Sequence, residues 1–298
     1  RANLGITVIE FPNNYAADPQ DYLRKGLEAR DILESESLIN FTMSPHSPYT
    51  VSDKTFEQIS VLANQLHLPI HLHIHETKTE IEESLKQYGK RPIERLDTLG
   101  LLSPSLMGVH AVHIDDIEIA LLARQGCSVV HCPASNLKLA SGFSPIGKLL
   151  RNKINVAIGT DGAASNNRLD MLAEIRLAAL LAKAVDCHAE TLPAHQALHM
   201  ATLGGARALA LEDQIGSIKI GKIADLTAID LSNIETQPNY DVASQIVYSA
   251  GRENVTNVWV NGVRVLEDRN FKHPISNTIS QKVSYWTTKI ISNRKKNE

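Results

Sequence analysis

The sequence has 298 residues, of which 43% are hydrophobic and 21% charged, and its formal net charge is −3. This size fits one α/β barrel with a small additional segment. The near balance of 30 basic and 33 acidic residues argues against a nucleic-acid-binding protein, which would carry a concentrated basic surface. No apolar run approaches the roughly 20 residues that span a bilayer, so we expect no membrane association. Three cysteines without a Cys-x-x-Cys pair indicate a reducing compartment, and we expect a cytoplasmic protein.

Short β-rich runs alternate with longer segments of helical spacing over the first two thirds of the chain. Six runs are typical of strands: residues 4–9, 38–43, 69–75, 106–112, 127–132 and 155–160. Between them, residues 52–66 begin with a Ser cap, and the apolar residues of 172–182 recur at helical spacing. Strands that alternate with helices predict a parallel α/β sheet, here a barrel over residues 1–210. Six units are fewer than the eight of a closed barrel, so we expect the barrel to be incomplete at its N-terminal side.

The pattern changes after residue 210 to short strands with Gly turns. Asn261-Gly262 between two apolar runs predicts a two-residue hairpin. Residues 211–270 are too few for a full sandwich, so we expect them to be the C-terminal part of a composite β-sandwich. Residues 271–298 are expected to form a C-terminal helix and tail, with the helix over 276–291 packing back.

Twelve histidines are present, and several of them lie at strand ends, where parallel α/β folds build their sites. Alternation over residues 69–76 places His71, His73 and His75 on one face of a strand. We expect that face to line the barrel lumen. Together with Glu76, which follows, it predicts a metal site or an acid/base site.

Asp161 is the second anchor of the predicted site. The same alternation puts Asp161 above the small residues Ala157 and Gly159, which leave room for an ion and a water in the lumen. The alternative is an Asp-Gly turn that only caps the next helix.

The other histidines differ in what their positions predict. His110 is expected in the lumen, and His113, three residues later, at a helix start. His46 ends a polar strand face and is expected at the rim in contact with a ligand, although a plain turn residue is the alternative. For His131, shaping the pocket and simple packing are both open. The remaining histidines lie in helical or tail segments and are not expected in the site: His67, His188, His195, His199 and His273.

Four motifs together resemble the amidohydrolase superfamily. They are His-x-His-x-His-Glu-Thr from His71, Val-His-Ala-Val-His-Ile from Val109, His-Cys-Pro-Ala-Ser-Asn-Leu-Lys-Leu from His131 and Gly-Thr-Asp-Gly-Ala-Ala-Ser-Asn-Asn from Gly159. They look most like its branch of 5-methylthioadenosine/S-adenosylhomocysteine deaminases and related triazine chlorohydrolases. The resemblance runs in consistent order from about residue 4 to residue 266. It implies a TIM-type (β/α)8 metal-dependent hydrolase barrel.

The resemblance also implies roles for individual residues. His73 and Asp161 would be metal ligands, with Asp161 also a base. Glu76 would shuttle a proton to the ring nitrogen of the substrate, and His110 would orient the attacking water. His46 would contact the ribose and Ser165 would line the purine pocket, so that substrate is held by these two together with Glu76 and Asp161.

The activity implied is hydrolytic deamination of an adenosine-type nucleoside, 5-methylthioadenosine or S-adenosylhomocysteine, to the inosine analogue and ammonia. One divalent metal ion would be the cofactor, with zinc as first choice beside iron and manganese. The family also implies a homo-oligomer. Two alternatives stay open: an amidohydrolase that acts on guanine, cytosine or an s-triazine, and a barrel protein without catalysis.

One departure from the family pattern concerns the metal site. The family has a His-x-His pair on the first barrel strand, and no such pair precedes His46. His73 and Asp161 alone are two ligands, whereas catalytic zinc sites use three or more. We therefore expect the chain in isolation to bind metal poorly and to be inactive, and to need an N-terminal segment that completes barrel and site.

Overall fold

The computed structural model describes residues 1–272 and 276–297. Contacts within the chain divide it into two units. The first unit is Arg1–Ile223 with Leu231–Arg252, and the second is Ala224–Asp230 with Glu253–Glu298. Leu231–Arg252 therefore associates with the barrel residues, although it lies within the range that the sequence assigns to the β-sandwich. His273 lies outside the described residues.

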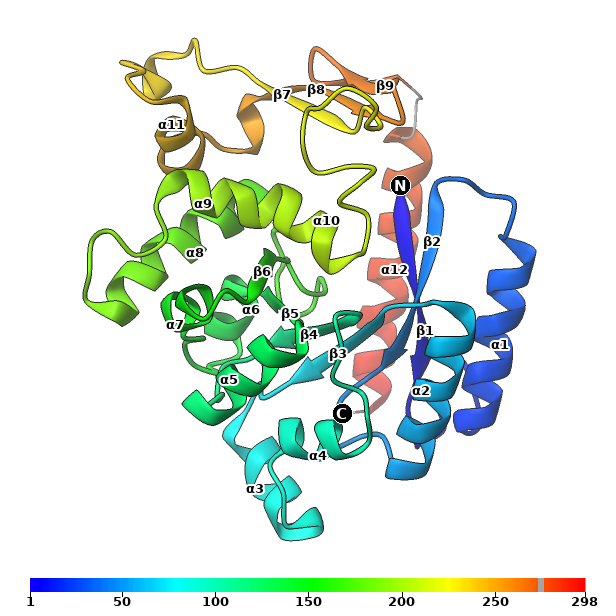
Figure 1. The fold of residues 1–298 in the computed structure, drawn as a ribbon. Coiled ribbons are helices and arrows are strands. Elements are labelled where there is room, and N and C mark those ends of the chain that lie inside the picture. Colours follow the sequence, from blue (N-terminus) through cyan, green and yellow to red (C-terminus); the bar gives the residue numbers. More distant parts are fainter. Residues whose placement is uncertain (273–275, 298) are drawn as a thin grey trace. The chain divides into compact units, whose positions relative to one another are not determined.

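A parallel six-stranded sheet forms the centre of the first unit, with its strands side by side in chain order (Figure 1). The strands are β1 (Ala2–Val8), β2 (Ile39–Pro45), β3 (Ile70–Ile74), β4 (Leu106–His110), β5 (Ser128–His131) and β6 (Asn155–Ile158). All six predicted strands are present, and every pair is parallel. This is the sheet of a TIM-type α/β fold.

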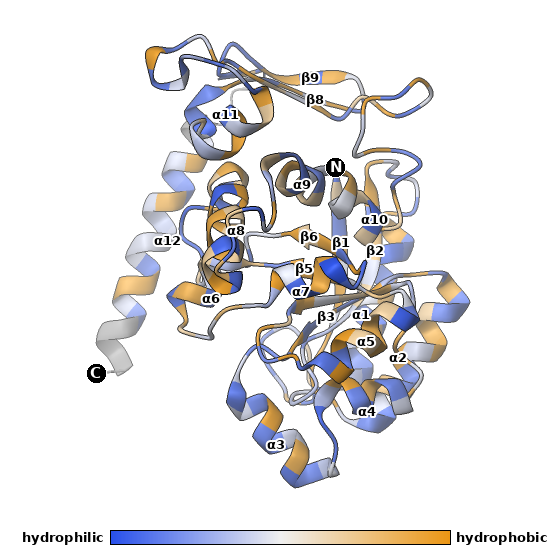
Figure 2. Cartoon of the chain, turned by 60° about the vertical axis from the view of Figure 1, so that its left-hand side comes forward, coloured by the Kyte–Doolittle hydropathy of each residue, from blue (hydrophilic) through white to orange (hydrophobic). Residues whose placement is uncertain are grey.

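Helices connect the strands, as expected for βαβ units. They are α1 (Pro19–Ile32), α2 (Asp53–Leu66), α3 (Lys78–Tyr88), α4 (Pro92–Thr98), α5 (Asp116–Gln125), α6 (Pro133–Lys138), α7 (Ile146–Arg151) and α8 (Met171–Asp186). After them come α9 (Ala194–His199), a π-helical turn (Met200–Gly204), α10 (Gly205–Ala208) and α11 (Val242–Tyr248). Hydrophobic and hydrophilic stretches alternate along these helices (Figure 2), as expected when one side of each helix is buried.

Local sequence signals explain where the helices begin and end. The Ser52 side chain accepts a hydrogen bond from the Thr55 amide at the start of α2, and His67 ends that helix with φ 52°. The Asp170 side chain accepts from the amides of Leu172 and Ala173 at the start of α8. Both predicted helices are thus confirmed, and such a side-chain cap contributes about 1 kcal/mol.

The two faces of the sheet bury different residues. On the helix side, Leu72, Ile74, Leu106 and Val156 belong to one large hydrophobic core. Alternation sends the other set of side chains to the opposite face, where a small cluster forms from Met107, Ala157 and Ala208, with Val130 and Leu209 packed against it. The helix side therefore supplies most of the stabilising burial, and the lumen side is left for polar groups.

Five predicted strands extend further than the strands of the structure, one of them residues 4–9, since β1 ends at Val8. β3, β4, β5 and β6 end one or two residues before the predicted ends, at Ile74, His110, His131 and Ile158. Left-handed backbone explains most of this difference, because φ is positive at His75, His110, Ala111 and Asp161. For a residue with a side chain this conformation costs roughly 1–2 kcal/mol. Some of the left-handed residues of the chain thus lie at the strand ends where the site is predicted.

The second unit contains a four-stranded antiparallel sheet in the order β10-β9-β8-β7. Its strands are β7 (Leu226–Ile229), β8 (Val255–Val260), β9 (Val263–Glu267) and β10 (Asn270–Phe271). The predicted hairpin is confirmed, because Asn261 and Gly262 join β8 to β9 with φ 52° and 76°. The last helix, α12 (Ser276–Asn297), confirms the predicted helix. The completion of this sheet into a composite sandwich, the packing of α12 and the three predicted domain ranges stay predictions.

None of the helices in the described parts of the chain is long and apolar enough to cross a membrane.

Candidate active site

The predicted site residues come from the carboxyl ends of four strands. His46 follows β2, His73 lies in β3, His110 ends β4 and Asp161 follows β6. The ring of His73 is the centre of the group: its centroid is 5.1 Å from that of His46 and 5.5 Å from that of His110. His71 lies on the same strand face, with its ring 6.5 Å from that of His73. Active sites of parallel α/β barrels form at this edge.

His110 reaches the lumen by a route that alternation does not predict. In the register of β3 and β4, His110 is opposite Ile74, and Leu106 is opposite Ile70. Ile70, Ile74 and Leu106 all face the helix-side core, so a regular strand would point His110 the same way. Its φ of 76° instead turns the ring toward His73, with which it stacks at an interplanar angle of 24°.

His75 shows the opposite behaviour, and its predicted place in the lumen is wrong. Its φ of 52° turns the side chain away from His71 and His73 and into the layer of α4 and α5. There the ring is fully buried, Nε2 accepts from the Ile93 amide at 3.2 Å, and Nδ1 is 3.2 Å from the His113 carbonyl oxygen. Burial lowers the pKa of His75 to about 3. His75 is therefore a neutral structural residue.

His73 presents one nitrogen to the site. Its Nδ1 lies 2.5 Å from the His46 carbonyl oxygen and donates to it, which leaves the Nε2 lone pair available for a ligand. The ring of His46 is held in turn by Ser47 and Thr50, whose hydroxyls lie 3.1 and 3.0 Å from its Nδ1. Burial, and the neighbouring His73, lower the pKa of His46. A neutral His46 suits contact with an uncharged sugar or ring.

Glu76 and His110 approach each other beside the ring of His73. The Glu76 Oε2 atom is 3.8 Å from His110 Nε2, and the Glu76 side chain is 19% exposed, so it can meet a substrate. On its other side, His110 Nδ1 donates to the Asn136 Oδ1 atom at 2.8 Å. This bond leaves a lone pair on Nε2, directed toward Glu76. Burial lowers the pKa of His110, although the charge of Glu76 and the bond to Asn136 oppose the change.

Asp161 is held as a carboxylate. The Ser135 hydroxyl donates to it at 2.6 Å and the Gly162 amide at 2.7 Å, and the Ser165 side chain also bonds to it. Burial raises the pKa of Asp161, but these hydrogen bonds outweigh burial and the pKa is lowered. Ser165 thus lies beside Asp161, and its contact with a purine stays a prediction.

The donor types fit a divalent metal ion, but their number falls short. His73 offers an imidazole nitrogen and Asp161 a carboxylate oxygen, both of which zinc accepts. Within the described residues, no group of three or more His, Cys, Asp or Glu side chains is arranged to hold a metal ion. His73 and Asp161 as metal ligands therefore stay a prediction.

Ser135 and Asn136 contact two of the predicted site residues, and sequence reasoning did not single them out. Both lie on α6, inside the quoted motif that begins at His131, and they bond to Asp161 and His110 respectively. The signal was their position directly after a strand end. His131 itself is 3% exposed, neither ring nitrogen has a hydrogen-bond partner, and burial lowers its pKa to about 3. It lines a cavity of about 10 Å³ together with Asn136, Gly142 and Ser144.

The remaining histidines lie elsewhere. His113 precedes α5, as predicted, and its Nε2 donates to the Ser141 carbonyl at 2.8 Å. His67 follows α2, His188 follows α8, and α9 carries His195 and His199. These four stay outside the group of rings around His73.

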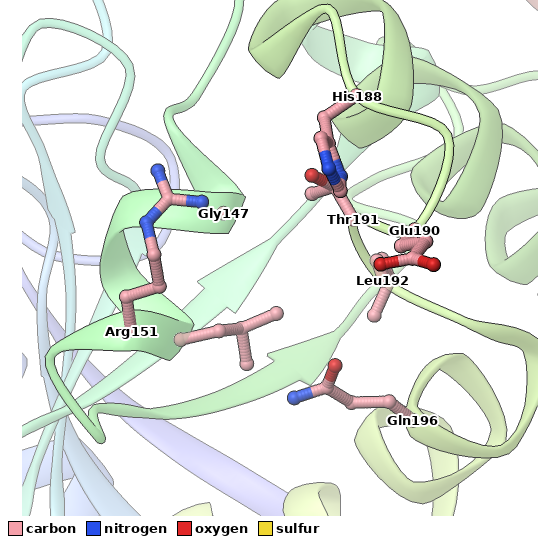
Figure 3. A pocket seen from close by; sticks show the side chains of 8 residues that line it. Gly147, Arg151, His188, Glu190, Thr191, Leu192 and Gln196 are labelled. Atoms are coloured by element: carbon pink, nitrogen blue, oxygen red, sulfur yellow. The ribbon is translucent and has the colours of Figure 1, made fainter.

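A larger surface pocket of about 330 Å³ lies away from this group (Figure 3). It is lined by residues of α7, of the segment that joins α8 to α9, and of α9 itself, including Arg151, His188, Glu190 and Gln196. Because α7 leads into the amino end of β6, the pocket lies at the strand edge opposite to Asp161. None of the predicted site residues lines it.

Comparison with known proteins agrees with this geometry. The amidohydrolase family model matches residues 5–265, and the chain belongs to this family. Two curated relatives are named 5-methylthioadenosine/S-adenosylhomocysteine deaminase. The one from Teredinibacter turnerae is 45% identical and the one from Saccharophagus degradans 42% identical, each over 99% of this chain and 66% of the relative. The chain thus spans about two thirds of the length of these relatives.

A solved structure has a closely similar fold. It is an adenosine deaminase from Xanthomonas campestris with bound zinc, with a TM-score of 0.96 and 48% identity, covering 98% of this chain and 66% of that protein. A triazine hydrolase variant matches with a TM-score of 0.89 at 24% identity over 96% of this chain and 65% of its own, which shows the fold alone.

Proposed function

We propose that this chain is the larger part of a metal-dependent deaminase that converts 5-methylthioadenosine or S-adenosylhomocysteine to the inosine analogue and ammonia. The observation that carries the proposal is the meeting of Glu76 and His110, at 3.8 Å, beside the ring of His73 at the carboxyl ends of β3 and β4. A scaffold protein has no physical need for such a convergence of titratable groups. The relatives named as deaminases support the same activity.

His73 and Asp161 would hold one divalent cation, with zinc as first choice because a similar structure is described with bound zinc. When bound, the cation supplies a hydroxide nucleophile near neutral pH. Asp161, kept ionised by Ser135 and Gly162, accepts the proton that the nucleophile loses. His110 orients the nucleophile toward the ring carbon, with its lone pair fixed by Asn136.

Glu76 completes the proton transfers. Attack on an aromatic carbon requires an acid that protonates the adjacent ring nitrogen, and loss of ammonia requires a second proton on the leaving amine. Glu76 is the partly exposed carboxyl group that faces His110, so it would take the first proton of the water and pass it to the ring nitrogen. Asp161 would pass the proton that it accepts from the nucleophile to the leaving amine. His46 and Ser165 lie on either side, at the rim of β2 and beside Asp161, where they would contact the ribose and the purine.

The proposal includes a segment that precedes residue 1. The sheet described here has six strands, and a closed (β/α)8 barrel has eight. A segment with the two further strands would close the barrel, add metal ligands and supply the other strands of the β-sandwich. By "full-length protein" we mean this chain together with that segment; we place it in the cytoplasm as a homo-oligomer.

The test is ammonia release by the full-length protein from 5-methylthioadenosine, S-adenosylhomocysteine, adenosine, guanine, cytosine and an s-triazine. We expect turnover of the two thioether nucleosides above all others. Turnover restricted to guanine, cytosine or the triazine would mean that the site catalyses another amidohydrolase reaction. No turnover of any of them by a metal-loaded protein would refute the deaminase.

A further inference from the structure

Glu80 is a buried acid to which the reaction proposed above assigns no role. It lies in the first turn of α3 and is 3% exposed. Its Oε1 atom accepts a hydrogen bond from the His75 amide and its Oε2 atom one from the Glu76 amide, both at 2.8 Å. One carboxylate therefore binds the two consecutive backbone amides that follow β3.

These two amides are at the point where the chain leaves the sheet. β3 ends at Ile74, and His75 is left-handed with φ 52°. The two hydrogen bonds from these amides to one buried side chain constrain this left-handed backbone. Burial raises the pKa of Glu80 to about 7, and its backbone hydrogen bonds oppose that rise.

The sequence of α3 places the carboxylate there. Thr77 caps the helix, accepting from the Glu80 amide at 3.2 Å, and Glu80 is the third helical residue. In a capping box, an acid at this position returns to the amide of the cap residue. Glu80 reaches further back, to the two residues that precede the cap. The first turn of α3 thereby fixes the backbone of Glu76, whose side chain is the proposed acid.

We propose that Glu80 is a positioning residue that fixes the backbone of Glu76, so that the Glu76 carboxylate stays in reach of His110 and the substrate. The inference rests on the proposed function for its kinetic consequence, but not for the contact itself. Two acceptor oxygens are required, because glutamine has one acceptor and would present its NH2 group to one of the two amides. Glutamine, which has nearly the same shape as glutamate, therefore does not replace Glu80.

The kinetic test uses the full-length protein. In Glu80→Gln we expect kcat to fall by about 10- to 100-fold, because misplacement of a reacting group by about 1 Å costs rate of this order. KM should stay within about twofold of the wild-type value, because no substrate contact is removed. Glu80→Asp keeps the charge and should retain more kcat than Glu80→Gln. The matched control is Glu82→Gln, an exposed residue of the same helix, which should leave both constants unchanged.

Hydrogen–deuterium exchange on the 298-residue chain tests the contact without substrate or metal. The amides of residues 75 and 76 should exchange at least about tenfold faster in Glu80→Gln than in wild type, and less so in Glu80→Asp, with no change in Glu82→Gln. If Glu80→Gln does not fold, Glu80→Asp decides.

The two readouts separate the possible failures. Wild-type exchange at residues 75 and 76 in a folded Glu80 variant would overturn the inference whatever the activity. A wild-type kcat in an active Glu80→Gln protein would overturn it too. Faster exchange in a full-length protein that deaminates none of the substrates would refute the proposed function and leave the contact standing.

Discussion

The chain turns left-handed at the ends of both β3 and β4, but the two turns send a histidine ring in opposite directions. His75, the residue that follows β3, and His110, the last residue of β4, both have a left-handed backbone, with φ 52° and 76°. At the end of β3 the turn takes the ring out of the lumen and buries it against α4 and α5. At the end of β4 the turn brings the ring into the lumen, against His73.

This difference gives His75 a role in stability and leaves His110 available for the proposed reaction. The nitrogens of His75 are used by backbone groups, Ile93 N–H and His113 C=O, so the ring has no position from which to meet a ligand. His110 gives only Nδ1 to the protein and directs Nε2 at Glu76. Two histidines near the ends of neighbouring strands thus have different expected effects when they are replaced, which the following variants measure.

The largest effect is expected for His110→Asn in the full-length protein. Loss of a group that acts in proton transfer or nucleophile orientation lowers kcat by about 10²- to 10⁴-fold. Stability should change little in comparison, since the ring makes one side-chain hydrogen bond to the protein, with Asn136. Steady-state kinetics and thermal unfolding check the two halves. A wild-type kcat in His110→Asn would mean that His110 takes no part in the reaction.

His75→Leu should reverse this pattern. It leaves the buried Ile93 amide and the His113 carbonyl without the ring, and each unsatisfied buried group costs about 1–3 kcal/mol. We expect the free energy of unfolding at pH 7 to fall by about 3 kcal/mol. Urea denaturation of this chain measures it. If stability is unchanged, the hydrogen bonds of His75 are not structural.

The pH dependence of stability gives a second comparison between wild type and His75→Leu. Burial lowers the pKa of His75 to about 3 in the folded protein, against about 6.5 in an unfolded chain. Between these values the unfolded state binds a proton that the folded state does not, so the contribution of His75 to stability is lost as pH falls below 6.5.

His75→Leu has no such group. The stability difference between wild type and His75→Leu should therefore shrink by about 2 kcal/mol from pH 7 to pH 5. Urea denaturation at the two pH values measures it. A difference that stays constant or grows would mean that His75 is protonated in the folded protein.

The smallest effect is expected for Asn136→Ala in the full-length protein. It removes the bond that fixes which nitrogen of His110 carries the hydrogen, a single interaction of about 1 kcal/mol, so kcat should fall about fivefold. The matched control is Asn167→Ala, an exposed amide that follows β6. Equal kinetics in the two variants would remove Asn136 from the site.

Sequence reasoning predicted the six strands of the parallel sheet and two of its helices well, because period-two alternation and helix caps are local signals. It succeeded for Ala157 and Val156, which face opposite sides of β6 as the pattern requires. It failed at His75, because left-handed backbone is set by the contacts that hold it, such as those of Glu80 and Ile93, and these are distant from a strand pattern.

Some residues of the candidate site could be predicted from the sequence, and others could not. His73 and Asp161 follow from strand pattern and motif. His110 was placed in the lumen by alternation relative to His113, but its actual route depends on φ 76°. Asn136 has no periodic signal at all, since only the fold of α6 onto β4 brings it to His110.

The most direct test of the account is the dependence of deamination on metal. Full-length protein is stripped with a chelator and assayed for ammonia release from 5-methylthioadenosine, then reloaded with zinc in steps. We expect activity to disappear on stripping and to return in proportion to zinc up to about one equivalent per chain, and Asp161→Asn to bind less zinc and stay inactive. Undiminished turnover by the stripped protein would contradict the account.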